Sequence, residues 1–252
     1  MTRADGRRVG ALAAAAALSA SLASAQTVDE VVRHYLEARG GAAKLRAVHS
    51  LRLKGTIEAP GLDAPAPLTL ELKRPDKMRT EILVAGHPLI RAYDGATAWM
   101  QPPVPGEPAR PMADDEAREA KAQADVDMSP LVDAAAKGFT VELVGRDRIP
   151  GGETWRLVVR GNGEPERTLH LDTRSHLVVR TDERRLLDGK EVDFATEIGD
   201  YRPVSGLVYP HHLEVGPVGG TEQQRVLIQS IEVNPPLDDA RFSPPKASAV
   251  LP

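Results

Sequence analysis

Repeated runs of alternating apolar and polar residues, each ended by a short turn, constrain the fold of this chain more than any other feature. Such a run is typical of a half-buried β-strand, whose successive side chains point to opposite faces. Five runs occupy residues 51–101, and seven more occupy residues 140–234. Most turns between them are too short for a parallel crossover, which needs about a dozen residues or more. The sequence therefore predicts about eleven or twelve antiparallel strands.

The turns carry the residues that tight hairpins prefer. Asp94-Gly95, Asn162-Gly163 and Asp188-Gly189 each separate two strand-like runs. Asn, Asp and Gly tolerate a positive φ, which two-residue hairpin turns require. The chain of 252 residues contains 21 Gly and 21 Pro, which agrees with many turns rather than long helices.

Short helices are predicted before the first strand. Apolar residues fall at helical spacing in residues 28–36, with Thr27 as a plausible N-cap and Gly40-Gly41 as the end. A second short turn covers residues 42–48. We expect both segments to turn their apolar side chains toward the sheet.

A polar insert separates the two groups of strands. A proline-rich loop leads into a charged, alanine-rich stretch at residues 114–127, which predicts a helix. Residues 130–137 predict another short helix, with Ser129 as N-cap and Pro130 at the first helical position. After the last strand, the tail is expected to dock through one turn around Phe242.

A sheet of this width must curl. Eleven strands about 4.8 Å apart would span roughly 50 Å if flat. A short helix hides a strip only about 10 Å wide, so the few helices cannot fill the concave side. The predicted fold class is mainly β: a curved antiparallel half-barrel of about eleven strands with a few short helices over its concave face.

An incompletely filled concave face predicts an apolar groove. Only nine aromatic residues are available to fill space, so Leu, Ile, Val and Met would form the lining. A soluble protein seldom exposes such a surface without use, which favours an apolar ligand. The competing arrangement is a sheet whose halves pack face to face and leave no cavity. The residues predicted to line the groove are Leu51, Leu53, Ile57, Leu68, Leu70, Leu72, Met78, Ile82 and Trp99.

The N-terminal segment is typical of an export signal. Arg3, Arg7 and Arg8 precede an uncharged run at residues 9–22, and Ala23-Ser24-Ala25 has the small-x-small pattern of a cleavage site. The run is shorter than the roughly 20 apolar residues of a membrane span, so a retained anchor is the weaker interpretation. We expect a signal peptide at residues 1–25, cleaved near Ala25, and a single periplasmic domain at residues 26–252.

Composition excludes several classes of protein. The chain has no cysteine, which excludes disulfides, thiol nucleophiles and cysteine-bound zinc. Its formal net charge of −4 lacks the basic footprint of a nucleic-acid-binding protein. Outside the N-terminus no apolar run approaches membrane length, so an integral membrane protein is not expected.

No catalytic or metal-binding motif stands out. The chain contains no G-x-S-x-G nucleophile motif, and a plain turn explains Ser205. His211 and His212 are neighbours on a predicted strand and would point to opposite faces, which disfavours a shared metal. The acidic run at residues 114–116 lacks the spacing of a calcium loop and suits a helix N-terminus. We expect no enzyme activity, no metal and no cofactor.

Two further features bear on a ligand. Residues 114–137 would form either an ordinary surface helix or a movable lid over the groove. Arg91 alternates with apolar residues on a predicted strand. It is either a rim charge facing solvent or a polar anchor for a ligand head group.

Five short strings stand out by their order and spacing. They are residues 35–41 with Lys44 and Leu45, residues 73–79, residues 92–95 with Trp99, residues 200–202 with Gly206, Leu207, Tyr209 and Pro210, and residues 238–242. Together they resemble the outer-membrane lipoprotein-sorting protein family, which has the LolA-like fold, and the resemblance spans nearly the whole chain after residue 25. The resemblance implies a half-barrel with helices over its concave face. The best-known members of that family carry lipoprotein acyl chains without catalysis.

These observations favour a non-enzymatic periplasmic carrier or sensor that binds a lipid or the acyl chain of a lipoprotein in the groove. An envelope protein would load or empty it. The alternative is an interaction module that binds a peptide or partner protein on the concave face or at a sheet edge. An envelope enzyme is a third and weaker hypothesis.

Overall fold

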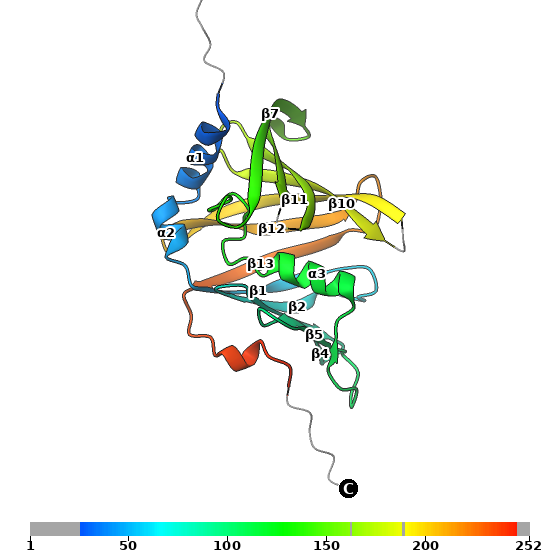
Figure 1. Ribbon diagram of the computed structural model, residues 1–252. Coiled ribbons are helices and arrows are strands. Elements are labelled where there is room, and N and C mark those ends of the chain that lie inside the picture. The colour runs from blue at the N-terminus through cyan, green and yellow to red at the C-terminus, as the bar shows by residue number, and fades with distance from the viewer. Residues whose placement is uncertain (1–25, 162, 188–189, 246–252) are drawn as a thin grey trace, which may run out of the picture.

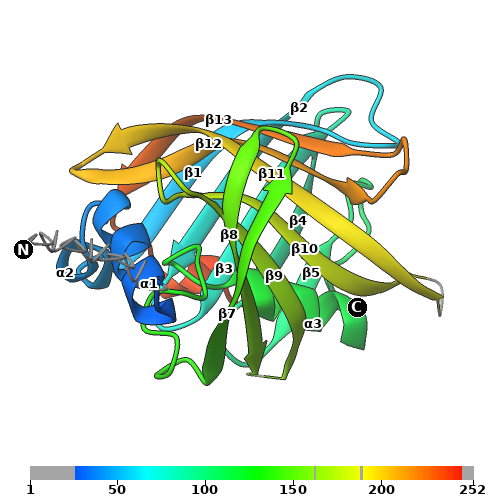
Figure 2. The same cartoon turned by 90° about the horizontal axis from the view of Figure 1, so that it is seen from above.

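The computed structural model describes residues 26–161, 163–187 and 190–245. The predicted signal peptide and its cleavage site at Ala25 lie outside these residues. The described residues form one antiparallel sheet of thirteen strands, in the order β6-β5-β4-β3-β2-β1-β13-β12-β11-β10-β9-β8-β7. It curls into an open half-barrel (Figures 1 and 2), which confirms the predicted fold class. The chain therefore starts in the middle of the sheet, runs to one edge, and returns from the other.

The strand bounds follow the predicted runs closely, with one addition. The extra strand, β6, contains Pro111 and lies at an edge, where a missing N–H costs little. The first group is β1 (Ser50–Glu58), β2 (Ala66–Lys73), β3 (Lys77–Val84), β4 (His87–Tyr93), β5 (Ala98–Gln101) and β6 (Arg110–Pro111). The second group is β7 (Phe139–Ile149), β8 (Gly152–Gly161), β9 (Glu164–Asp172), β10 (Val178–Leu187), β11 (Lys190–Val204), β12 (Leu207–Pro217) and β13 (Gln224–Val233).

The first and last strands join the two groups. β1 pairs with β13 across a register shift between Lys54 and Gly55. A Cβ at Gly55 would lie only 1.9 Å from the carbonyl oxygen of Leu227. Glycine at this position therefore lets the two backbones approach closely enough to continue the sheet.

Three of the four helical segments predicted in the N-terminal region and the insert form as expected. In α1 (Val28–Ala38) the Thr27 hydroxyl accepts a hydrogen bond from Glu30 N, and the Glu30 carboxylate accepts one from Thr27 N. The short α2 (Ala42–Arg46) follows directly. α3 (Asp114–Gln123) begins at the acidic run, as its charges favour. In Figure 1, α3 crosses in front of the sheet between its two groups of strands.

The helix predicted at residues 130–137 is wrong, because these residues form a series of turns. Asp133 adopts a left-handed conformation with φ of 53°, which interrupts a right-handed helix. Its carboxylate accepts hydrogen bonds of 2.9 and 2.6 Å from the guanidinium of Arg46 on α2. A tertiary contact has therefore overridden the local helix signals of Ser129 and Pro130.

The C-terminal tail lies along the convex face of the first group of strands. Phe242 is fully buried after a single turn of 3-10 helix (Asp239–Arg241), as predicted. Its carbonyl accepts a 2.7 Å hydrogen bond from Trp99 Nε1 on β5. Arg241 pairs with the buried carboxylate of Glu71 at 2.8 Å. The tail thus covers apolar surface that β2 and β5 would otherwise expose.

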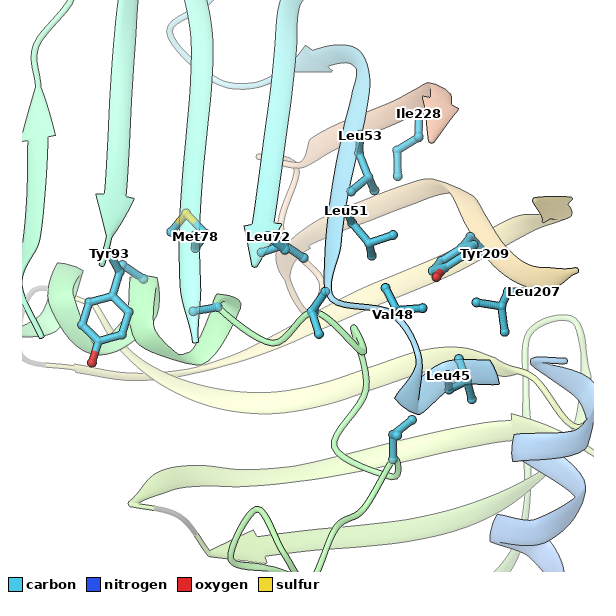
Figure 3. Packing of buried hydrophobic residues seen from close by; sticks show 14 of the residues in the cluster. Leu45, Val48, Leu51, Leu53, Leu72, Met78, Tyr93, Leu207, Tyr209 and Ile228 are labelled. Carbon is cyan, nitrogen blue, oxygen red and sulfur yellow. The ribbon is translucent and has the colours of Figure 1, made fainter. Parts of the chain in front are cut away.

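Most of the buried apolar residues form two clusters, and the first of them extends from β1 to β4 onto Leu207, Tyr209 and Ile228 of β12 and β13. The first contains Leu51, Leu72, Met78 and Tyr93 together with residues of the insert (Figure 3). The second is built around α1 and strands β7 to β10. Within the described residues, no helix is both long enough and apolar enough to cross a membrane.

Candidate functional site

The strand register places the predicted groove residues in ladders on one face. Leu51, Leu72, Met78 and Tyr93 stand opposite one another on β1 to β4. We call this ladder the inner rung. All four side chains are buried, and Figure 3 shows them on neighbouring strands. The inner rung therefore belongs to the core.

The next ladders on the same face are less covered. A middle rung consists of Leu53, Leu70, Thr80 and Arg91, and an outer rung of Gly55, Leu68, Ile82 and Leu89. Leu68, Ile82 and Leu89 are only half-buried and belong to neither core cluster. Apolar side chains are thus more exposed on the outer rung than on the inner rung, whereas Ile57 and Ala66, the next pair on the same face, are buried again.

Ile57 extends this apolar face toward the second group of strands. It stands opposite Ala66 on β2 and Val226 on β13, and Val226 stands opposite Leu213 on β12. Val226 and Leu213 are partly buried side chains packed against the first core cluster. Leu51, Leu53, Ile57, Leu68, Leu70, Leu72, Met78 and Ile82 consequently share one face of the sheet, as the alternation predicted.

Trp99 does not share this face and is a correction to the predicted groove. It pairs with Ala92 on β4, whereas the next residue of that strand, Tyr93, belongs to the inner rung. Successive residues of a strand point to opposite sides, so Trp99 projects from the convex face. There it is buried under the C-terminal tail and bonded to the carbonyl of Phe242.

The insert fills the deep end of the concave side. Met112, Ala120, Ala124, Val126 and Val132 are buried in the same cluster as the inner rung. The insert therefore seals the inner rung from solvent and leaves the outer rung partly uncovered. The face is neither a fully open groove nor the closed sandwich of the competing arrangement.

Asp127 holds the end of the insert in place. Its buried carboxylate pairs with Arg74 at 2.6 Å and with Lys137 at 2.8 Å. Its carbonyl oxygen lies 3.4 Å from Nη2 of Arg39. This buried anchor contrasts with α3, whose ion pairs all include half-exposed side chains.

Arg39 is a buried residue whose importance sequence reasoning missed. Its guanidinium donates to the Val208 carbonyl and to the Tyr35 hydroxyl, both at 2.7 Å, and lies 5.3 Å from the ring centre of Tyr209. Burial raises the pKa of Tyr209 to about 12, although Arg39 opposes the shift. The spacing of Tyr35 and Arg39, four residues apart on one helix, was the available signal.

The second group of strands has a different concave side. Near α1 it is apolar and buried, with Trp155, Leu157 and Leu171 in the second core cluster. Farther along the strands, Arg167 on β9 stands opposite Glu183 on β10. Burial lowers the pKa of Arg167 and outweighs the opposing effect of Glu183. Ion pairs occupy the positions where the first group has half-buried Leu and Ile.

α3 connects the two sides through one carboxylate. Glu119 lies 3.0 Å from Nη2 of Arg91 on β4 and 4.0 Å from Nη1 of Arg185 on β10. Arg91 belongs to the middle rung, so it faces the concave side rather than the outer solvent. The structure thus gives Arg91 a partner within the protein on the concave side, and its role as a polar anchor for a ligand head group stays a prediction.

Two hollows in the surface lie elsewhere. An open cavity of about 650 Å³ lies beside the junction of β1 and the tail, next to His49, Lys73 and Asn234. A smaller one, of about 120 Å³, is lined by residues that include Arg180, Glu197 and Glu214. Neither includes a residue of the three rungs. A ligand that reached the inner rung would need the insert to move, because the insert packs on that rung.

Histidines and carboxylates form no metal site in the part of the chain that the structure describes, where no group of three or more such residues is placed to hold an ion. His170 is bonded to Asp182 at 2.8 Å and lies 3.5 Å from the Thr154 hydroxyl. Thr154 is buried, so this Thr-His-Asp arrangement offers no accessible nucleophile. It joins three neighbouring strands instead.

Comparison with solved structures identifies the fold. A LolA superfamily protein from Nitrosomonas europaea superposes with a TM-score of 0.59 and 11% identity, over 87% of this chain and 98% of that one. A DUF1329 family protein from Desulfovibrio piger gives a TM-score of 0.58 and 11% identity, over 86% and 98%. An outer membrane lipoprotein-sorting protein domain from Vibrio parahaemolyticus gives 0.54 and 10%, over 84% and 97%.

These solved structures and this chain share one fold, an open antiparallel half-barrel. No family model matches the sequence, and no curated protein matches it. The chain has a LolA-like fold, as its short sequence strings predicted.

The structure also shows that several of those strings contact one another. Gly40, at the end of α1, packs so closely on the turn before β12 that a Cβ would lie 2.6 Å from the Gly206 carbonyl oxygen. A Cβ on Gly95, after β4, would likewise lie 3.1 Å from a carboxylate oxygen of Asp76. Trp99 meets Phe242 in the tail. The five strings therefore include pairs that contact each other across the fold.

Proposed function

We propose that this protein is a non-enzymatic periplasmic carrier or sensor that binds a lipid or an acyl chain on its concave face. The observation that carries the proposal is the exposure gradient from the inner rung to Leu68, Ile82 and Leu89. Half-buried apolar side chains in register on one face present a continuous surface to a hydrocarbon chain. The LolA-like fold and the signal-like sequence of residues 1–25 support the same role.

Hydrophobic burial supplies the affinity in this proposal. A twelve-carbon chain gains roughly 10 kcal/mol at about 0.8 kcal/mol per buried CH₂. Association and ordering cost about 4–15 kcal/mol, so most of the chain must be covered for useful binding. To bury most of such a chain, the protein would need both the outer rung and the concave surface that the insert covers.

Mass spectrometry of extracts from protein purified without detergent tests the proposal. The wild-type protein should carry lipid, and Ile82→Glu should remove most of it, because a carboxylate on the outer rung opposes contact with a hydrocarbon chain. Leu83→Glu is the matched control. Leu83 is the next residue of β3, points to the convex face and is already 41% exposed.

The two variants separate the outcomes. Lipid retained by Leu83→Glu and lost by Ile82→Glu would support binding on the concave face. Absence of lipid from the wild-type protein, with no binding of added lipid either, would refute the proposal. Equal lipid content in all three proteins would place the lipid somewhere other than the outer rung.

A second candidate function uses the edge of the sheet to bind a partner protein. β7 spans eleven residues, exposes Val144, and has β8 as its one partner strand among the described residues. An extended peptide could add to this edge by main-chain hydrogen bonds. Val144→Pro would then abolish cross-linking to an envelope partner without changing the lipid content. Cross-linking that persists in this variant would contradict edge binding.

A further inference from the structure

Glu119 places a negative charge between two arginines that belong to opposite sides of the half-barrel. Its carboxylate lies 3.0 Å from Arg91 and 4.0 Å from Arg185. Among the residues that the structure describes, Glu119 is the only carboxylate paired with Arg91 within 4.0 Å. If α3 withdrew, Arg91 would lose its counterion.

Apolar side chains border this charged contact. Leu89, in the outer rung, lies two residues from Arg91 on the same face of β4. On the other side, the guanidinium carbon of Arg185 lies 4.7 Å from the ring centre of Phe194. The two cations therefore stand beside surfaces suited to a hydrocarbon chain.

α3 covers the site with little apolar contact of its own. Its sequence is DDEAREAKAQ, and its contacts with the first core cluster come from Ala117 and Ala120, continued by Ala124 just beyond its end. These side chains contribute one methyl group each, whereas an acyl chain of twelve carbons would bury many more groups in their place. A chain of that length can therefore compete with α3 for the concave face.

Anchoring of the insert allows such a replacement without loss of the fold. The buried anchor at Asp127 lies four residues beyond the end of α3 and has no contact with Glu119. The ion pairs of α3 itself involve Arg91, Arg110 and Arg185, all with partly exposed side chains. Partly exposed ion pairs contribute little to stability and are readily exchanged.

We infer that Glu119 occupies the position of a ligand's anionic head group, and that Arg91 and Arg185 bind this head group when an amphiphile with a single hydrocarbon chain displaces α3. The inference rests on the proposed function and adds the class of ligand to it. The head group is a carboxylate or a comparable anion on one hydrocarbon chain. Neutral lipids lack the charge that would replace Glu119.

The local balance of charge favours an anion over a cation. Glu183 pairs with both Arg167 and Arg185, and Glu164 also pairs with Arg167. Asp125, which is held by Lys137, adds a further negative charge near Arg167. Arg91 differs from these arginines, because among the described residues Glu119 is its one carboxylate partner within 4.0 Å. An incoming anion would therefore replace the counterion that Arg91 loses when Glu119 withdraws.

Isothermal titration calorimetry of delipidated protein with laurate, 1-dodecanol and acetate tests the inference. Laurate and dodecanol share the chain and differ in the charge of the head, whereas acetate has the head without the chain. Wild-type protein should bind laurate about tenfold more tightly than dodecanol, the effect of one charge-assisted hydrogen bond. Acetate should show no binding at the same concentrations.

Variants locate the effect. Arg91→Gln and Arg185→Gln should each weaken laurate binding about tenfold and leave dodecanol binding unchanged. Glu119→Gln should strengthen laurate binding several-fold, because the competing charge is removed. Arg184→Gln is the matched control, since Arg184 lies on the opposite face of β10 and pairs with Asp193 at 2.8 Å. It should bind both amphiphiles like the wild type.

The outcomes distinguish this inference from the proposed function. Equal affinity for laurate and dodecanol in every protein would overturn the inference while supporting an apolar binding face. Acetate binding as tight as laurate binding would also overturn it, because the site would then take a small anion. Failure of both laurate and dodecanol to bind any of the proteins would refute the inference and count against the proposed function itself.

Discussion

Each of the two sides of the half-barrel has a buried core cluster at one end of its strands, but the two sides differ at the other, outer end. On β1 to β4 the inner rung is sealed by the insert, and half-buried Leu68, Ile82 and Leu89 follow it. On β8 to β10 the core cluster packs on α1, and Arg167 and Glu183 follow it. One side ends in apolar side chains and the other in ion pairs.

This difference separates the residues that hold the fold from those free to define a ligand. Buried rungs on both sides pack against helices or the insert, so any change there alters the core. The side chains at the outer positions contact solvent and one another rather than the core, so substitutions there should cost little stability. An apolar wall facing a charged wall suits an amphiphile, whose two ends differ in the same way.

The largest expected effects on the free energy of unfolding come from substitutions in the two core clusters, and they should be equal on the two sides. Leu72→Ala on β2 and Leu171→Ala on β9 should each lower the free energy of unfolding by about 3 kcal/mol, because both side chains are almost fully buried. Urea denaturation followed by circular dichroism measures the change. A loss below about 1 kcal/mol for one variant alone would show that its side of the sheet is loosely packed.

A smaller effect should appear on the convex face of the first side, where the tail docks. Burial on its own raises the pKa of Glu71, but hydrogen bonds from Arg241 and Arg52 outweigh it and hold this pKa below its usual value. Glu71→Gln should cost about 2 kcal/mol of stability at pH 7, the typical contribution of hydrogen bonds to a charged group. Denaturation at several pH values measures it.

The pH dependence of this variant has a defined sign. A carboxyl whose pKa is depressed by folding stabilises the protein above its unfolded pKa of about 4.3. That contribution is lost as the pH falls through the lower folded value, so the difference between wild type and Glu71→Gln should begin to shrink below about pH 4.3 and close once the pH is below the folded pKa. Glu81→Gln, on the same face but 39% exposed, should cost less than about 0.5 kcal/mol. A gap that stays constant down to pH 2 would contradict the role given to Glu71.

Local alternation was enough to predict most of the concave face. The period of two in residues 51–58 and 68–84 places Leu51, Leu53 and Leu70 on one side without knowledge of their partners. The prediction that Trp99 lines the groove failed because the turn before each strand decides which of its alternate residues face the concave side. Only the pairing of Trp99 with Ala92 shows which side it takes.

Contacts between distant segments were beyond prediction from the sequence. Glu119 and Arg185 are 66 residues apart and meet only because the insert crosses the sheet. The turns at residues 130–137 replaced a predicted helix for the same reason, since Arg46 holds Asp133. Periodicity describes each strand or helix by itself, whereas these contacts depend on how the segments dock. Ligand binding at the predicted residues stays a prediction.

The smallest expected effects concern the outer positions, and they bear most directly on the difference between the two sides. Ile82→Ala on the apolar side and Arg185→Gln on the charged side should each change the free energy of unfolding by less than about 1 kcal/mol. Ile82 is half-buried outside both core clusters, and the side chain of Arg185 is 35% exposed. Urea denaturation of delipidated protein measures both.

Removal of lipid is essential to this measurement, because a bound chain would stabilise the folded state and exaggerate the effect of Ile82→Ala. The same two variants measured with lipid present should then lose stability in proportion to their loss of binding. A cost of about 2 kcal/mol or more in the delipidated Ile82→Ala protein would assign the outer rung to the core. The outer positions of the two sides would in that case differ only in composition, and the apolar side would expose no surface to a hydrocarbon chain.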